Sequence, residues 1–209
     1  MNTVTDFGII PIDYSILNGI LNTYKSPKDK VVDMVRNKEL IRLKKGLFVG
    51  SPKINKLPIS KELVANHLYG PSYLSLESAL SIYGLIPERV HSIRSITVKR
   101  SKKFTNNLGF FDYTHVTNAY FEIGIQFKIV NDQFAYLIAS PEKALCDMII
   151  ATPKLRIQSA RAMQCYLEED LRLDFTSINT FDIDIVRRCM EVGKNKLELG
   201  NLINFMKSC

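Results

Sequence analysis

Residues 26–50 constrain the fold of this chain most, because a short helical pattern runs directly into a hairpin pattern. Ser26 is a favourable N-cap and Pro27 suits the first position of a helix, so this segment predicts a helix over residues 27–37. Residues 40–49 follow as two short apolar and basic runs around Lys45-Gly46, where glycine accepts the positive φ of a tight turn. We therefore expect a helix followed at once by a two-stranded hairpin.

The predicted hairpin should carry cations on its outer side. Side chains alternate along a strand, and one face of a strand is usually buried. This alternation puts Ile41 and Leu43 on the buried face and Arg42 and Lys44 on the exposed one, with Lys45 at the tip. Outward cations at a turn favour contact with phosphate groups, so duplex DNA is the first partner that the pattern indicates.

Another helical pattern precedes the first one, and a short link over residues 24–26 joins the two helices. Its apolar stripe consists of Ile16, Leu17, Ile20 and Leu21. The stripe expected in the second helix consists of Val31, Val32, Met34 and Val35. Two helices and a basic hairpin favour a winged helix-turn-helix. The third helix of a full winged domain would come from residues 6–11 or from a helix after Ser60.

The second helix is the candidate recognition helix, which would lie in a major groove while the hairpin holds the adjacent backbone. A helix N-terminus suits a phosphate, and Lys, Arg and Asn side chains suit phosphates or base edges. The candidate DNA-binding residues are Ser26, Lys28, Lys30, Arg36, Asn37, Arg42, Lys44 and Lys45. Asp29 and Asp33 interrupt this helix face, so an ordinary solvated surface is the alternative interpretation.

The net charge of +7 is concentrated in the first half of the chain. Residues 1–105 hold 17 Lys and Arg against 8 Asp and Glu, whereas residues 106–209 hold 11 against 13. Counterion release favours a concentrated basic surface on nucleic acid, so a DNA-binding front part and a rear part with another task are indicated. The cluster over residues 99–103 would extend a DNA track or contact another acidic partner; its alternative is a charged loop that keeps a strand end soluble.

A boundary between two domains is expected near Pro58. Residues 51–58 contain two prolines and no periodicity, which is typical of a linker. We therefore predict a DNA-binding domain over residues 1–58 and a C-terminal domain over residues 59–209. The predicted fold class is α+β, with an N-terminal winged helix-turn-helix followed by a mixed α/β C-terminal domain.

The rear part shows both helical and strand patterns. Helices are expected after the N-caps Ser60 and Ser75, and Gly84-Leu85 predicts a Schellman-type stop. Residues 121–129 alternate apolar and polar and predict a strand with one buried face, which turns near 131–132 into a second strand. Helical patterns fill the remainder, in the ranges 141–149, 157–171, 184–192 and 197–206.

Three segments together carry a family resemblance. They are the hairpin LIRLKKGLFV over 40–49, the block over 70–88 that begins GPSYLSLESAL and ends YGLIPE, and the block ASPEKALCD over 139–147. In this order they resemble the AbiEi-like antitoxins, the abortive-infection family of bacterial type IV toxin-antitoxin systems. The middle block is the most distinctive of the three.

The resemblance implies two activities. The N-terminal winged domain would bind inverted repeats in double-stranded DNA at its own promoter and repress the operon. The C-terminal domain would counteract a nucleotidyltransferase-type toxin without needing a stable complex. A plain winged-helix transcriptional regulator, whose rear half senses a ligand or dimerises, is the alternative.

No motif of the sequence indicates catalysis, so we expect a protein that is not an enzyme and that has no catalytic residue, metal site or cofactor. Phosphate-cradling glycine loops, HExxH and GxSxG are missing, and the three histidines stand apart in the sequence. A PD-(D/E)xK nuclease is the rival from another class, because Asp112 and the run Gln126-Phe127-Lys128 imitate its spacing. Gln126 is, however, a poor substitute for a metal-binding carboxylate.

A cytoplasmic protein without membrane association is expected. No apolar run approaches the roughly 20 residues that cross a bilayer, and the first residues lack the basic-then-apolar order of a signal peptide. The cysteines are too far apart in sequence for CxxC pairs, and we expect reduced, mostly buried thiols. They are Cys146, Cys165, Cys189 and Cys209.

Overall fold

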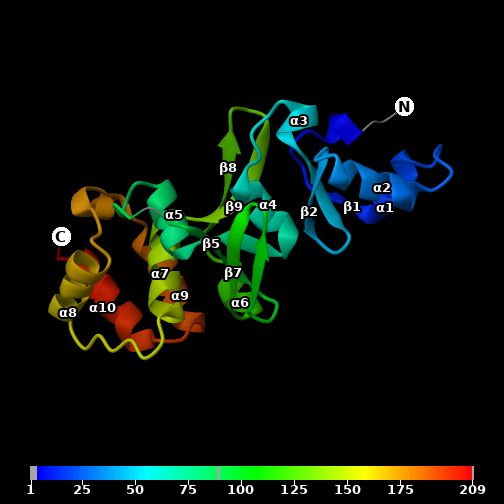
Figure 1. Cartoon of the computed structure of the whole chain (residues 1–209). Helices are drawn as coiled ribbons and strands as arrows, with labels where there is room; N and C mark the ends of the chain where they lie inside the picture. The colour runs from blue at the N-terminus through cyan, green and yellow to red at the C-terminus, as the bar shows by residue number, and fades with distance from the viewer. Residues whose placement is uncertain (1–3, 89, 209) are drawn as a thin grey trace.

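A six-stranded mixed sheet lies in the middle of the molecule, between an N-terminal part and a group of C-terminal helices at the opposite end (Figure 1). The computed structural model describes residues 4–88 and 90–208. Helices and strands follow one another in an irregular order along the chain, so the α+β class predicted from the sequence is confirmed. Cys209 lies outside the described residues.

The N-terminal part joins three helical segments to a small antiparallel sheet. Its elements are the 3-10 helix η1 (Val4–Phe7), β1 (Ile12–Asp13), α1 (Tyr14–Ile20), α2 (Pro27–Arg36), β2 (Leu40–Lys44) and β3 (Leu47–Gly50). The strand order is β1-β3-β2, since Ile12 pairs with Phe48 and Ile41 pairs with Val49. Val4 of η1 joins the apolar core of this part, so a helical turn lies close to residues 6–11, one of the two places where a third helix is expected.

The helix α2 forms where the sequence predicts it and ends at Asn37, its C-cap residue. Val31 and Met34 are buried as expected, but Val32, which was predicted to belong to the buried stripe, is 50% exposed. In α1, Leu17 is buried whereas Ile16 is 44% exposed. Both helices therefore bury a narrower stripe than predicted.

The hairpin β2–β3 contributes to two apolar cores. Leu40 and Phe48 belong to the N-terminal core, whereas Leu43 belongs to the large core of the central sheet, and Ile41 packs against that large core. The shared face of Ile41 and Leu43 is therefore confirmed. The prediction that the opposite face is left to solvent is wrong for most of the hairpin, because the two parts of the chain enclose it from both sides.

A bulge interrupts the alternation that the sequence predicts for β2. The register shifts between Arg42 and Lys44, so Arg42 pairs with Phe48 while Lys44 pairs with Leu47. A bulge adds one residue to one strand and turns the following side chain to the other face. Arg42 consequently stays on the outside, and Lys44 turns toward the central sheet.

The segment after the hairpin, where the sequence predicts a linker, contains a short helix. Residues 52–55 form one helical turn, α3 (Pro52–Asn55), and the Ser51 hydroxyl accepts a hydrogen bond from the Lys53 N–H at 3.2 Å. A serine N-cap followed by proline is also a helix start, so part of the expected linker forms a helical turn.

The central sheet has the strand order β6-β7-β5-β4-β9-β8. Its strands are β4 (Ser72–Leu74), β5 (Ser92–Thr97), β6 (Lys102–Asn106), β7 (Gly109–His115), β8 (Ile125–Val130) and β9 (Phe134–Ala139). The pairs β4–β9 and β5–β7 are parallel, and the other pairs are antiparallel. Helix α4 (Lys61–Leu68) packs on this sheet, where the Tyr113 hydroxyl donates to the Ala65 carbonyl at 2.7 Å.

The predicted strand over 121–129 is only partly present. Residues 118–121 form the short helix α6 (Asn118–Phe121), and β8 begins at Ile125. Phe127 is 76% exposed and Ile129 is 66% exposed, so the expected buried face is wrong. The alternation is real, but β8 is an edge strand, and in the described residues no element covers the face that carries Phe127.

The remaining helices lie at the end of the molecule that is opposite to the N-terminal part (Figure 1). They are α5 (Leu76–Ile82), α7 (Pro141–Ala151), α8 (Ala160–Cys165), the π-helical turn η2 (Tyr166–Asp170), the 3-10 segment η3 (Phe175–Thr180), α9 (Ile183–Val192) and α10 (Lys196–Met206). The Schellman-type stop of α5 is confirmed, because the Leu85 N–H donates to the Leu80 carbonyl at 2.9 Å. Over residues 4–88 and 90–208, no helix has the length and apolarity that a bilayer crossing requires.

Candidate nucleic-acid interface

The outer face of α2 is accessible and carries both signs of charge. Lys28 and Arg36 are exposed, and the Arg36 guanidinium lies 3.3 Å from the Asp33 carboxylate. The Lys30 ammonium lies over the ring of Tyr24 at 5.0 Å from its centroid. These are weak surface pairs that an incoming phosphate can replace, because an exposed ion pair contributes only about 0–1 kcal/mol.

The start and the end of α2 hold the other two candidates on this helix. Ser26 is the N-cap by backbone geometry, and its carbonyl accepts the Lys30 N–H at 3.1 Å. Asn37 is exposed at the C-cap, and its carbonyl accepts the Lys53 ammonium at 3.1 Å. The Asn37 N–H also donates to the Asp33 carbonyl. Two hydrogen bonds therefore hold the backbone of Asn37 in place.

Arg42 lies beside α2. The side chain is exposed, and together with Val31, Val32, Val35 and Phe48 it lines a shallow hollow between the helix and the hairpin. Lys45 is exposed at the turn, where Gly46 takes the positive φ of 80° that the sequence predicts. One exposed cation therefore flanks α2, and a second stands at the tip of the hairpin.

Lys44 is not an outward cation, which corrects the sequence-based expectation. Its ammonium donates to the Leu68 carbonyl at 2.6 Å, at the end of α4. Burial lowers the pKa of Lys44, Asp13 opposes this effect, and the neighbouring ammonium groups of Lys99 and Lys102 lower the pKa further. Lys44 therefore links the hairpin to α4, and its charge lies near those of two other lysines.

The three lysines Lys44, Lys99 and Lys102, here called the basic ridge, bring the two predicted basic segments together. Lys99 and Lys102 lie over the ring of Tyr69, with ammonium-to-centroid distances of 5.4 and 5.7 Å. Lys102 also lies 4.9 Å from the ring centre of Phe104. Cations on aromatic rings keep their charge near the surface while their stems pack on apolar groups. The ridge thus continues the cationic side of the hairpin onto β6.

The hairpin is held against the central sheet by polar contacts as well as by apolar packing. The Asn106 side-chain amide donates to the Leu43 carbonyl at 3.2 Å. Neither Asn106 nor Tyr24 was singled out in the sequence, because a lone amide or tyrosine carries no spacing signal. The proximity of Lys44 to Lys99 was likewise hidden, since more than 50 residues separate them along the chain.

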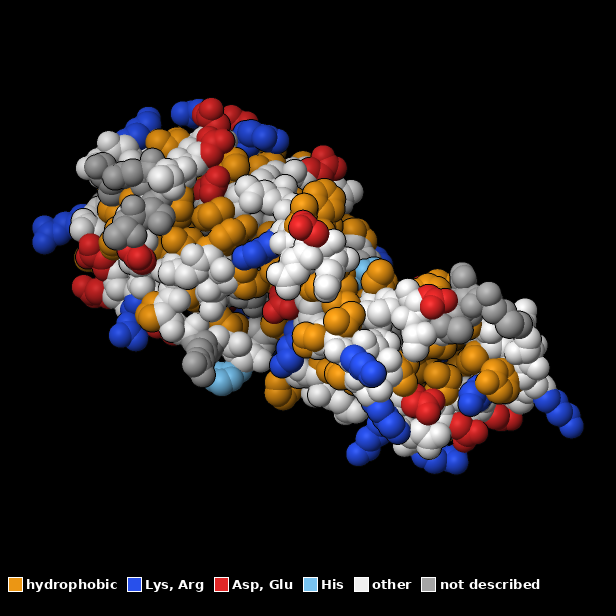
Figure 2. All heavy atoms as spheres, turned by 90° about the horizontal axis from the view of Figure 1, so that it is seen from above, with side chains coloured by type: hydrophobic (Ala, Val, Ile, Leu, Met, Phe, Trp, Pro, Cys, Tyr) orange, Lys and Arg blue, Asp and Glu red, His pale blue; other side chains and the backbone are white. Residues whose placement is uncertain are grey.

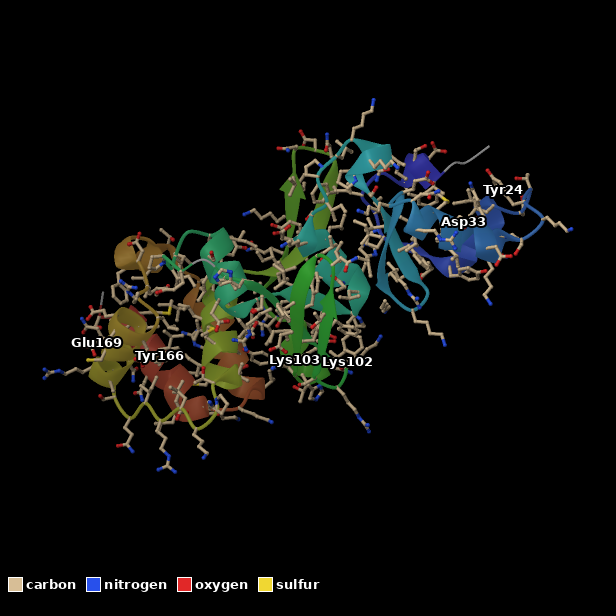
Figure 3. All side chains as sticks on the ribbon, viewed as in Figure 1. Tyr24, Asp33, Lys102, Lys103, Tyr166 and Glu169 are labelled. Carbon is tan, nitrogen blue, oxygen red and sulfur yellow. The ribbon has the colours of Figure 1, made fainter. Side chains whose placement is uncertain are left out.

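The charges on this side of the molecule are mixed. Figure 2 shows Lys and Arg side chains interspersed with Asp and Glu over the narrow, N-terminal end. Figure 3 places Tyr24 and Asp33 on that end and Lys102 and Lys103 on the central sheet. Lys103 is paired with Asp112 at 3.7 Å, which reduces its share in the positive surface. The surface therefore suits a partner that tolerates gaps between cationic contacts.

A second polar cluster is fully buried and joins two of the three segments that carry the resemblance. The Asp147 carboxylate accepts hydrogen bonds from Ser75 Oγ at 2.5 Å and from the Tyr120 hydroxyl at 2.8 Å, and it lies 3.4 Å from the Lys143 ammonium. Burial, and then the Asp147 charge, raises the pKa of Tyr120. Lys143 and Asp147 have side chains that are 0% exposed, so this cluster is a structural joint between α5 and α7.

Two glutamates of these segments, Glu77 and Glu142, are also engaged within the fold. The Glu77 carboxylate accepts two hydrogen bonds from Arg94, at 2.6 and 2.7 Å. Glu142 is 7% exposed, and burial raises its pKa. Of the cysteines, Cys146 and Cys189 are buried free thiols, whereas Cys165 is exposed.

The residues that imitate a nuclease motif do not meet. Asp112 lies on β7 and Gln126 and Lys128 lie on β8, with β5, β4 and β9 between these strands. Four strand steps at about 4.8 Å each separate them by about 19 Å, which is too far for a shared metal ion. Among the described residues, no group of three or more His, Cys, Asp or Glu is arranged to hold a metal ion.

No protein-family model matches this chain, and no curated protein sequence matches it. The fold and the site define an α+β protein with an exposed helix, a cationic hairpin and a basic ridge on one side.

Proposed function

We propose that this chain binds duplex DNA through α2 and the hairpin β2–β3, and that it acts as an antitoxin of the AbiEi-like type. The observation that carries the DNA-binding role is the order helical turn, strand, helix, helix, hairpin, with β1 paired to β3. That order agrees with a winged helix-turn-helix, in which the helix before the hairpin enters the major groove.

The positions of the exposed residues support this mode of binding. In it, α2 presents Lys28, Arg36 and Asn37 to the groove, and its N-terminus at Ser26 faces a phosphate. Arg42 and Lys45 contact the backbone next to the groove. Lys44 acts from the basic ridge as a charge near the duplex, because its ammonium is already bonded to Leu68.

The antitoxin role is supported by the way in which the resembling segments meet. The block over 70–88 supplies Ser75, and the block over 139–147 supplies Asp147, which accepts its hydrogen bond. Two of the segments that resemble the AbiEi-like antitoxins thus contact each other in one buried cluster, which agrees with a core shared with that family. Control of a nucleotidyltransferase toxin by the rear part is proposed from this likeness alone.

DNA binding is tested by fluorescence anisotropy with a duplex from the chain's own promoter, at salt concentrations from 50 to 200 mM. We expect Arg42→Ala with Lys45→Ala to weaken binding and to lower the slope of log K against log salt by about two, one for each lost phosphate contact. Lys44→Met should change the slope less than either single variant. The matched control is Lys196→Ala with Lys207→Ala, at the far end of the molecule. Equal slopes for the hairpin and control variants would refute the proposed interface.

The antitoxin role is tested by growth. Co-expression of this chain with the product of the neighbouring gene should restore growth that the neighbour alone arrests. Rescue that persists in the Arg42→Ala, Lys45→Ala variant would separate neutralisation from promoter binding. A neighbour that does not arrest growth would contradict the antitoxin proposal and leave the DNA-binding test unaffected.

A further inference from the structure

The two edges of the central sheet differ in whether another segment covers them. At one edge, β6 is covered by the hairpin, since Asn106 donates to the Leu43 carbonyl and β2 packs beside β6. At the other edge, β8 pairs only with β9, and no strand of the described chain lies on its outer side (Figure 1). An uncovered edge strand offers a row of backbone N–H and C=O groups to another strand.

The side chains of β8 favour contact rather than protection of this edge. Phe127 is 76% exposed and Ile129 is 66% exposed. Their register partners on β9 are Leu137 and Ala135, so four apolar residues share one face of the β8–β9 hairpin. Adjacent large apolar side chains on a free edge mark an interaction site, because natural edge strands are usually blunted by charges or prolines.

The one cation of β8 does not guard the edge. Lys128 lies over the ring of Tyr83, with its ammonium 5.4 Å from the ring centroid, so its charge is drawn back onto its own chain. The residues on either side of Lys128 are the exposed Phe127 and Ile129. By contrast, the covered edge strand β6 begins with Lys102 and Lys103.

We propose that β8 docks a second copy of this chain, antiparallel and related by a two-fold axis at Phe127. This register places Phe127 opposite its own copy, Ile125 opposite Ile129, and Gln126 opposite Lys128. No like charges meet in this register, because each Lys128 lies opposite an uncharged Gln126. A two-fold axis at Lys128 would instead bring two ammonium groups together, which is destabilising when they lie directly opposite.

The resulting contact joins two six-stranded sheets into one. A single pair of six-residue strands buries less surface than the roughly 1,600 Å² of a standard stable interface, so the dimer is concentration-dependent. Two-fold contacts of this isologous kind are the commonest in soluble oligomers. The inference does not depend on DNA binding, because it concerns the free protein.

The test is the mass of the full chain in solution from 1 to 500 µM, measured by sedimentation equilibrium. The wild-type chain should rise from 23.8 kDa toward twice that mass. Phe127→Glu should stay at the monomer mass throughout. Phe110→Glu is the matched control, because Phe110 is 61% exposed on β7, inside the sheet, and it should associate like the wild type.

A second measurement fixes the register. In a chain that carries Cys165→Ser and Cys209→Ser, Phe127→Cys should form a covalent dimer under mild oxidation, and Phe110→Cys should not. A wild-type chain that remains monomeric at 500 µM would overturn the proposal. Growth beyond the dimer, or dimers that resist Phe127→Glu, would overturn it as well, since a two-fold pairing at β8 closes on itself.

Discussion

At the scale of single residues, the buried pair Lys143 and Asp147 shows how polar groups are kept inside this fold. Each charge has the other beside it, and hydrogen bonds from Ser75 and Tyr120 satisfy the carboxylate. The Lys143 ammonium also donates to the Tyr120 carbonyl at 2.9 Å. Removing one partner of such a cluster strongly lowers the free energy of unfolding, because the remaining charge is left in a poorly solvating interior.

Asp147→Ala should therefore destabilise the protein by about 3–5 kcal/mol, because Lys143 loses the carboxylate that pairs with it while remaining buried. Urea unfolding followed by circular dichroism measures the change. Asp184→Ala is the control, since the Asp184 pair with Arg187 is exposed and should contribute about 1 kcal/mol or less. Similar losses for the two variants would contradict the structural role of the cluster.

Glu142 makes the free energy of unfolding depend on pH. Burial raises its pKa above the ordinary value of 4.5, so the folded chain holds this proton more tightly than the unfolded chain. The free energy of unfolding then falls as pH rises from 4.5 through the raised pKa, because the folded state binds more protons in this range. In Glu142→Gln this fall should be missing when urea unfolding is measured between pH 4 and 7. Glu122→Gln, at an exposed position, should keep it.

At the scale of elements, two glycines differ in what they allow. Gly124, before β8, has a φ of +62°, and a Cβ there would lie 2.9 Å from the Lys143 Cβ. Gly19 lies in α1, where a Cβ would meet nothing within 4 Å. The first glycine is required by its turn, whereas the second weakens a helix.

Gly124→Ala should thus destabilise the fold by about 2–4 kcal/mol, through left-handed strain together with overpacking. Gly19→Ala should stabilise it by about 0.5–1 kcal/mol, because alanine restricts the unfolded chain and favours the helix. Thermal unfolding of both variants beside the wild type measures the two signs. A stabilising Gly124→Ala would show that the close approach to Lys143 is absent in solution.

At the scale of the whole molecule, the hairpin β2–β3 couples the two apolar cores. Leu40 and Phe48 pack in the N-terminal core, and Leu43, Leu47 and Val49 pack in the central one. The 1–58 and 59–209 division remains a prediction about folding units. A cut near residue 58 would uncover the apolar surface that the hairpin now covers.

We expect the full chain to unfold in one transition, with equal calorimetric and van't Hoff enthalpies. Leu43→Ala should lower the midpoint of that single transition, at a cost of about 2–5 kcal/mol, because Leu43 is 3% exposed at the junction. Scanning calorimetry measures both quantities. Two separate transitions, of which Leu43→Ala shifts only one, would mean that the cores unfold independently.

Local patterns predicted the parts of this fold that depend on near neighbours in sequence. The helix α2, the turn at Gly46 and the stop of α5 at Gly84 follow from caps and from positive φ, which a few adjacent residues determine. The predictions that proved wrong concern which side chains are buried. Phe127 and Ile129 alternate like a half-buried strand, yet their exposure depends on which strand ends the sheet, and strand order is decided by distant segments.

The sequence by itself determined where α2 begins and ends, where the turn at Gly46 and the stop of α5 lie, which half of the chain is cationic, and which residues were candidates for a DNA interface. Tertiary structure decided which of those cations stay available: Arg42 and Lys45 face outward, whereas the bulge in β2 turns Lys44 onto Leu68. It also brought Lys99 and Lys102 beside Lys44. The reason is physical, since local conformation depends on adjacent residues, while exposure and charge proximity depend on contacts that only the complete fold creates.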